Sequence, residues 1–373
     1  KALSLAGENW DVVETVADFY HATRQFPGAV EAYQTVIRHN PDQLVTREKL
    51  ARVYAAMGED EKLLETLLGI AEIDTQNATI LRQIAGIYIQ RKQYPEAVPY
   101  FQRALAIGKG TEDEYKAVAG VMIEERQSEA AIDFIKGAAY LFPESPDFPM
   151  LLTYPFAFEE KWDKAVEQFE RAVELGADKP EMFNESFYFR FAAANERLGN
   201  IEEAEKLFQK TIELLSKLAP DDEVQQFTAT TYNYLGYMWL ENDMNLDEAG
   251  ELIKTAADLD PESEAIADSL GWFYFKKGNF EKALDELLRA EELMGEPGED
   301  EAEILDHIGQ VFDKLGDREK ALEYLEKAVE LDPENSDYAR HLEEVKNSKS
   351  DEDPAEATPV KVPKPTKEER PAA

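Results

Sequence analysis

The chain has 373 residues, 43% of them hydrophobic and 10% aromatic, which is enough apolar material for a sizeable core and excludes a wholly disordered chain. Its 78 acidic residues outnumber its 40 basic ones and leave a net charge of −38, which repels nucleic-acid phosphates and anionic lipids. The absence of cysteine excludes disulfides, thiolate metal sites and cysteine catalysis. We therefore expect neither a nucleic-acid partner nor direct insertion into a membrane.

A helical pattern recurs along the chain, and an alanine near the start of every second predicted helix marks each repeat except the second, which has leucine there. This column of residues is Ala29, Leu63, Ala97, Ala131, Ala165, Ala204, Ala249, Ala283 and Ala321. The first four steps between them are 34 residues each, and the later steps are 39, 45, 34 and 38 residues. Such a fixed period predicts a stack of similar helical units, because one short helix pair cannot bury its apolar face alone.

Two further columns precede the small residue. The first is a large residue followed by a small one, as in Leu50-Ala51, Ile84-Ala85, Leu235-Gly236, Leu270-Gly271 and Ile308-Gly309. The second, three residues later, holds a ring, as in Tyr54, Tyr88, Trp239, Tyr274 and Phe312. Small residues let two helices approach closely, and the ring fills the space that remains. Glycines then follow at the predicted turn between the helices, where they allow a left-handed backbone: Gly58, Gly199, Gly278 and Gly316.

These columns resemble the tetratricopeptide repeat, a helix–turn–helix unit of 34 residues. The resemblance covers roughly residues 11–334 as nine units. It implies an all-α protein, an α-solenoid coiled as a right-handed superhelix of about nine units, with a C-terminal capping helix. In this family the first helix of each unit, here called helix A, lines a concave face where ligand peptides usually bind, and helix B packs behind it.

Departures from the pattern predict how the chain is organised. Pro149 and Pro155 fall inside the first helix of the fifth unit, and each would cost about 3 kcal/mol in a regular helix interior. We therefore interpret this unit as a distorted joint; the alternative is one smooth superhelix with a local bulge. The predicted parts are an N-terminal array of four units (1–145), the joint with its insert (146–184), a C-terminal array of four units (185–334), a capping helix (335–347) and a disordered tail (348–373).

No catalytic motif accompanies the repeats, so we predict that the chain is not an enzyme and uses no cofactor or metal. The histidines lack the spacing of metal ligands, and we interpret His307 and His341 as solvent-facing polar residues. Lys116 is followed one turn later by Gly120, where chaperone-tail-binding members of the family carry asparagine, so a co-chaperone role is disfavoured.

The surface that remains for function is the predicted groove along the A helices. Matching the repeats places these residues on it: Met150, Tyr154, Phe158, Phe189, Asn233, Tyr237, Asp268, Trp272, Phe275, Asp306 and Gln310. Rings at this density predict a binding strip, and the alternative is that they pack sideways into neighbouring helices. Residues 201–350 carry 39 acidic against 15 basic side chains, so we expect a protein or peptide partner with apolar and basic residues.

The leading hypothesis is therefore a non-catalytic scaffold that binds a peptide, loop or partner domain in its groove. The alternative is a regulatory or substrate-presenting subunit of a larger enzyme complex, with catalysis in another chain. No basic-then-apolar signal peptide follows Lys1, which predicts a mature or trimmed chain. The Leu-Gly units resemble those of bacterial members of the family, many of them in the periplasm or at the cell envelope; the cytoplasm is the alternative.

Overall fold

A computed structural model of the chain describes residues 9–108, 110–295, 298 and 301–347. The tail predicted over 348–373 lies outside these described residues. The described part contains 19 α-helices and one short 3-10 helix, and no strand. Contacts divide the chain into two compact units, which we call the N-segment (Lys1–Leu214) and the C-segment (Leu215–Ala373).

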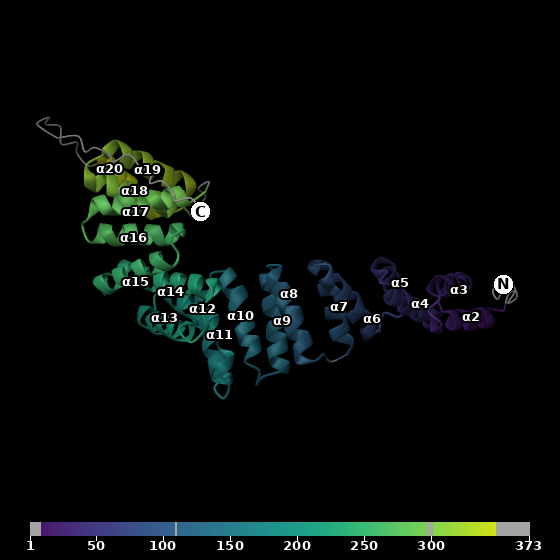
Figure 1. Cartoon of the computed structure of the whole chain (residues 1–373). Coiled ribbons are helices and arrows are strands. Elements are labelled where there is room, and N and C mark those ends of the chain that lie inside the picture. Colours follow the sequence, from purple (N-terminus) through teal and green to yellow (C-terminus); the bar gives the residue numbers. More distant parts are fainter. Residues whose placement is uncertain (1–8, 109, 296–297, 299–300, 348–373) are drawn as a thin grey trace, which may run out of the picture. The chain divides into compact units, whose positions relative to one another are not determined.

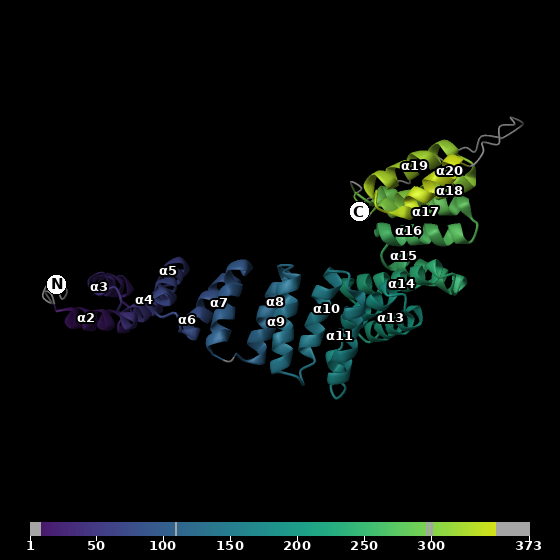
Figure 2. The same cartoon turned by 180° about the vertical axis from the view of Figure 1, so that it is seen from behind.

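The helices of the N-segment lie side by side in chain order (Figures 1 and 2). They are α2 (Trp10–Ala22), α3 (Phe26–His39), α4 (Leu44–Met57), α5 (Asp60–Ile73), α6 (Ala78–Gln90), α7 (Tyr94–Ile107), α8 (Glu112–Glu124), α9 (Ser128–Leu141), α10 (Asp147–Phe158), α11 (Trp162–Leu175), the 3-10 helix η1 (Pro180–Met182), α12 (Glu185–Arg197) and α13 (Ile201–Leu215). The even-numbered helices of this segment are the A helices of the repeats, and each is followed by its B helix.

The C-segment continues the same alternation. Its helices are α14 (Asp222–Glu241), α15 (Leu246–Leu259), α16 (Glu264–Lys276), α17 (Phe280–Leu293), α18 (Ala302–Leu315), α19 (Arg318–Leu331) and α20 (Ser336–Asn347). The last helix, α20, is unpaired, and its Leu342 and Val345 are buried in the same cluster as Leu325 and Ile308. It therefore covers the apolar face of α18 and α19.

Close approach of the two helices in a repeat explains the predicted columns. Every alanine of the marker column is fully buried. In the C-segment a Cβ built on Gly271 would lie only 2.5 Å from Leu287 Cγ, and one on Gly309 only 2.6 Å from Leu325 Cγ. Any larger residue there would force helices A and B apart. The predicted pairing of helices is thus confirmed at its contact points.

A left-handed residue ends helix A at the same position in repeat after repeat. The predicted glycines have positive φ, as at Gly58 (φ 70°) and Gly278 (φ 72°). Residues with a side chain occupy the same turn in other repeats: Arg24, Lys92, Arg126 and Glu160. An L-residue in this region costs roughly 1–2 kcal/mol relative to the right-handed one. The turn geometry is therefore common to the repeats, although only some carry the glycine that suits it.

The fifth repeat contains an unbroken helix A despite its prolines. Pro149 is the third residue of α10, in the first turn, where a backbone N–H would have no acceptor within the helix. Pro155 lies in the helix interior and is buried. Helix α10 packs against α8, α9 and α11. Residues 146–184 thus lie inside the N-segment, and the boundary between the two compact units falls some thirty residues later, after Leu214.

Candidate protein-binding surfaces

The residues predicted to line the groove all belong to A helices, and they divide between the two segments. Met150, Tyr154, Phe158 and Phe189 lie on α10 and α12 of the N-segment, and we call them the α10–α12 strip. The others lie on α14, α16 and α18 of the C-segment and are called the C-terminal strip: Asn233, Tyr237, Asp268, Trp272, Phe275, Asp306 and Gln310. The two strips differ in how far their side chains are open to solvent.

The α10–α12 strip presents apolar side chains that are not fully covered. Phe148, Leu152 and Phe156 form the buried face of α10 at a spacing of four residues. Met150, Tyr154 and Phe158 fall on the adjacent face of the helix, where the first two are partly exposed and Phe158 is 36% exposed. Phe189 on α12 is also partly exposed. The sequence pattern thus separates one packed and one accessible face on the same helix.

Two arginines stack on the rings of this strip. Arg126, in the turn after α8, places its guanidinium 3.8 Å from the Phe158 ring centroid. Arg190, on α12, lies 4.0 Å from the Tyr154 ring centroid, and its Nη1 donates a hydrogen bond to Thr153 Oγ1 at 3.2 Å. Among the described residues neither guanidinium has a carboxylate within ion-pair distance. Burial lowers the pKa of Arg190, because its charge is partly desolvated without a neighbouring anion.

Several other cations on the A helices of the N-segment pair with carboxylates of a neighbouring A helix. Lys49 lies 3.0 Å from Glu14 and 2.9 Å from Asp18 of the preceding A helix. Arg82 pairs with Glu114. Lys116 lies 2.8 Å from Asp147, whose hydrogen bond is the main cause of the raised pKa of this lysine. Among the described residues, Arg126 and Arg190 instead contact rings of α10 and form no ion pair.

Several side chains of the C-terminal strip contact one another and are buried. The Trp272 ring is sandwiched between His307, at 4.0 Å and an interplanar angle of 13°, and Phe275, at 4.5 Å and 6°. Its Nε1 donates to Glu241 Oε1 at 2.6 Å. Trp272 is therefore 7% exposed, and the prediction of an exposed ring at this position is wrong. The alternative interpretation, that the ring packs sideways into the neighbouring helix, applies to Trp272.

His307 is the centre of this set, and its predicted solvent-facing position is wrong. It is 5% exposed, and its Nδ1 lies 2.9 Å from Asp268 Oδ1. Burial alone would lower the pKa of His307, but the charge and hydrogen bond of Asp268, with Glu303 and Asp306 nearby, raise it to about 9. The imidazole is therefore protonated at neutral pH, and it forms a buried ion pair with Asp268.

Asp306 has the same kind of partner one repeat later. His341 Nδ1 lies 2.9 Å from Asp306 Oδ2, and Gln310 Nε2 donates to the same oxygen at 2.7 Å. Asp306 is 2% exposed and Asp268 6% exposed. Neither carboxylate is open to a partner, which corrects the expectation that they receive a basic segment. In both pairs the histidine follows the aspartate by about one repeat, at 39 and 35 residues.

The remaining members of this strip lie around its edge. Tyr237 is partly exposed, and its hydroxyl donates to Glu303 Oε1 at 2.5 Å. Burial and the charge of Glu303 raise the pKa of this tyrosine. Asn233 is buried, and its Oδ1 has no hydrogen-bond donor among the described residues. Most polar groups of the strip are thus used within the protein.

Two further searches of the described residues bear on the type of site. No group of three or more His, Asp or Glu side chains in that part of the chain is arranged to hold a metal ion. Across the same residues, no helix combines the length and apolarity needed to span a bilayer.

Comparison with protein families matches the repeats directly. Two tetratricopeptide repeat models match residues 77–110 and 262–334. The first match covers α6 and α7, and the second covers α16 to α19, so both coincide with whole helix pairs. The structure extends the same helix pair to nine repeats. The chain is a tetratricopeptide repeat protein with an all-α solenoid fold.

Solved structures with a similar fold have low sequence identity. The APC/C hetero-tetramer Cut9–Hcn1 is 13% identical over 92% of this chain and 91% of that chain, at a TM-score of 0.47. PilF from Pseudomonas aeruginosa is 17% identical over 62% of this chain and 97% of its own, at a TM-score of 0.46. The assembly chaperone of RpL4 is 16% identical over 64% and 96%, at 0.49. The search of curated proteins gives no significant match.

Proposed function

We propose that this protein is an interaction scaffold that binds a peptide segment of a protein partner across the α10–α12 strip. The observation that carries the proposal is the partial exposure of Met150, Tyr154, Phe158 and Phe189 on neighbouring A helices. Partly exposed rings contribute large contact areas at a small cost in side-chain entropy, which is why they are frequent among the residues that dominate binding energies.

The space beside the strip supports this assignment. A Cβ built on Gly120 of α8, or on Gly86 of α6, meets no atom within 4 Å. The A-helix surface next to Met150 and Tyr154 is therefore low and uncrowded, because small residues replace long ones there. A segment lying across α8, α10 and α12 would contact rings without displacing side chains of the protein.

The C-terminal strip has a different role in this proposal. Asp268, Trp272 and His307 are buried and contact each other across α16 and α18, and the buried Asp306 pairs with His341 of α20, so they hold the last two repeats and the final helix together. A partner would have to break the Asp268–His307 ion pair to reach them, which would cost several kcal/mol. We therefore assign binding to the N-segment and structural support to this strip.

Selection from a random-peptide phage library tests the proposal. Peptides enriched on the full chain should bind the variant carrying Tyr154→Ala and Phe158→Ala at least tenfold more weakly, because each ring is expected to contribute about 1–2 kcal/mol. The matched control carries Phe19→Ala and Tyr140→Ala, two rings that are 60% and 86% exposed elsewhere on the same segment. Enriched peptides that bind the strip variant and the wild type equally would contradict the proposal.

A further inference from the structure

Arg126 and Arg190 lie at the α10–α12 strip of a chain with 78 acidic and 40 basic residues. Both belong to the N-segment, and both lie against rings of α10, yet no carboxylate of the described residues pairs with either. Arg190 is the more demanding of the two, since its Nε is buried without a hydrogen-bond partner. A cation left in this state is destabilising unless something else supplies the missing acceptor.

We infer that the α10–α12 strip binds an acidic segment of a protein partner, whose carboxylates pair with Arg126 and Arg190 while its apolar side chains contact Tyr154 and Phe158. This inference rests on the proposed function and specifies the chemistry of its ligand. It replaces the basic partner expected from net charge, because the aspartates that were to receive such a partner are buried against histidines.

The stacking geometry leaves the donors of the exposed Arg126 available, whereas Arg190 can offer only its terminal nitrogens because its Nε is buried. A guanidinium carries five N–H donors in its plane, and contact with a ring uses its face rather than its edge. Thr153 Oγ1 accepts one bond from Arg190, and the ring of Tyr154 covers one face. A carboxylate can therefore approach the edge and accept two parallel bonds. Its charge would also oppose the burial that lowers the pKa of Arg190.

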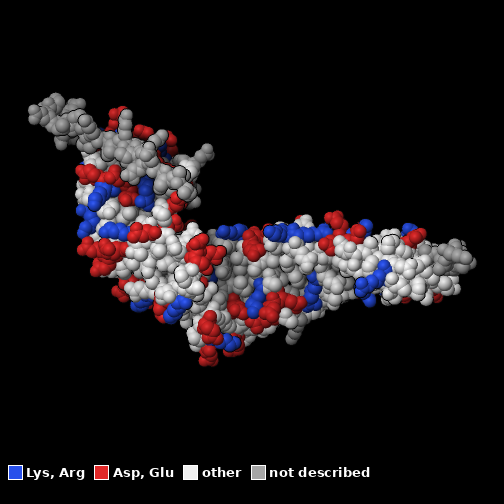
Figure 3. All heavy atoms as spheres, viewed as in Figure 1, with Lys and Arg blue, Asp and Glu red and all other residues white. Residues whose placement is uncertain are grey.

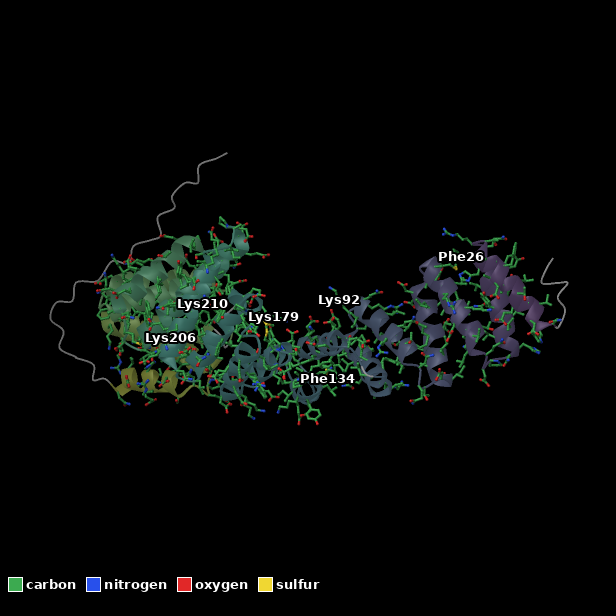
Figure 4. All side chains as sticks on the ribbon, turned by 90° about the horizontal axis from the view of Figure 1, so that it is seen from below. Phe26, Lys92, Phe134, Lys179, Lys206 and Lys210 are labelled. Carbon is green, nitrogen blue, oxygen red and sulfur yellow. The ribbon has the colours of Figure 1, made fainter. Side chains whose placement is uncertain are left out.

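The surrounding surface adds to the same field. Lys and Arg side chains gather along one edge of the N-segment, over α7 to α10 (Figure 3). Arg91 and Lys92 follow α6 in the turn that corresponds to Arg126, and Lys92 is labelled in Figure 4. Basic residues therefore follow the neighbouring A helices α6 and α8, whereas the equivalent turn after α10 holds Glu160. The basic residues after α6 and α8 attract an anionic segment toward the strip and speed its encounter.

A nucleic acid could also use stacked arginines and rings, but the charge of the whole chain opposes it. The net charge of −38 repels a polyanion whose phosphates extend far beyond two arginines. A short acidic segment needs to place only a few carboxylates in the local basic region. The observations thus favour a carboxylate-bearing peptide, and a nucleic acid is an outcome that the test must separate.

Fluorescence anisotropy with two matched decapeptides tests the inference on the full chain. One peptide alternates Glu and Ala around a central Leu, and the other has Gln at every Glu. The Glu peptide should bind roughly tenfold tighter or more, since hydrogen bonds to charged groups are the strong class. The difference should shrink as salt rises above ~0.15 M, because exposed charges are then screened within about 8 Å.

Variants at the two arginines locate the effect. Arg190→Gln and Arg126→Gln should each weaken the Glu peptide roughly tenfold while leaving the Gln peptide unchanged. Arg171→Gln is the matched control, since Arg171 lies on α11 and pairs at 2.5 Å with Glu174. Arg126 is exposed in a turn, so its variant keeps the test valid if Arg190→Gln does not fold.

Three results would overturn the inference: equal binding of the two decapeptides, arginine variants that behave like Arg171→Gln, or a deoxythymidine decamer that binds the strip more tightly than the Glu peptide. The failure of the inference is distinguishable from that of the proposed function. If library-selected peptides still depend on Tyr154 and Phe158 but show no preference for Glu over Gln, the strip binds peptides and only its acidic specificity is wrong.

Discussion

The α10–α12 strip and the C-terminal strip occupy the same columns of the repeat, yet one is open and the other is closed. Trp272 on α16 and Tyr154 on α10 stand at the same distance before the turn of their repeats. Trp272 is covered because the next A helix supplies His307 and its own helix supplies Phe275. Tyr154 is stacked by the Arg190 guanidinium and stays partly exposed. Whether a groove position becomes core or surface is therefore decided by the side chain one repeat away.

The difference in packing between the two strips is tested first by removing one ring from each strip. Trp272→Ala should lower the free energy of unfolding by about 3–5 kcal/mol, because it empties a buried ring site. Tyr154→Ala should lower it by about 1 kcal/mol, since its ring is partly exposed. Denaturant unfolding followed by far-UV circular dichroism measures both. Equal losses would show that the two strips are packed alike.

The same denaturant titration should show which segment of the chain loses stability. Repeats interact mainly with their neighbours, so parts of a solenoid can unfold separately. Trp272→Ala should shift only the portion of the transition that belongs to the C-segment. The unfolding transition of the N-segment should be unchanged in this variant. Fluorescence of the tryptophans of that segment follows this transition and serves as the internal control.

Alkaline pH tests the closed strip through His307. Its pKa is raised from 6.5 to about 9 on folding, so the folded chain binds a proton more tightly than the unfolded one. The stabilisation is fully present below pH 6.5 and is lost as pH rises through 9, with a total on the order of 3 kcal/mol. The groups that face this histidine are Asp268, Glu303 and Asp306, all acidic.

The control for this pH effect is His307→Gln, which keeps a hydrogen-bonding side chain without the titration. Its unfolding free energy should be lower at pH 6 but should fall less between pH 7 and 9 than that of the wild type. If the pH dependence is the same in both, the titrating group is elsewhere.

Much of the fold follows from the sequence because its signals are local to one repeat. The marker alanines are buried, and the glycines predicted at the turns have positive φ. Both requirements, a small side chain and a left-handed backbone, arise between two adjacent helices of the same repeat. The effect of Pro149 depends on its place in the helix, because in the first turn of α10 it removes no hydrogen bond.

The sequence predicts which repeat positions lie at the candidate site, but not how the side chains of one repeat contact those of the next. The state of Asp268 depends on His307, thirty-nine residues later, and single-column matching does not compare one repeat with the next. The signal was present, since an aspartate and a histidine recur one repeat apart at Asp306 and His341 as well. Arg190 was missed because it falls one position outside the expected stripe, on the side of α12 that faces Thr153 and Tyr154.

The turns offer the smallest and most selective test, because the C-segment uses Gly278 and Gly316 where the N-segment has Lys92 and Arg126. Lys92→Gly should raise the free energy of unfolding by about 1 kcal/mol by relieving a left-handed lysine. Arg126→Gly should give a smaller gain, because it also removes the contact with Phe158. Thermal denaturation of both variants measures the gains.

Peptide binding separates these two glycine variants. Arg126→Gly should weaken the Glu decapeptide roughly tenfold, whereas Lys92→Gly, on the basic edge but off the strip, should change it by less than about threefold. A basic residue kept in a strained turn, at a cost in stability, is what a binding role for Arg126 requires. If Arg126→Gly binds the peptide as tightly as the wild type, the strained arginine serves no such role, and the contrast between the two strips reduces to packing.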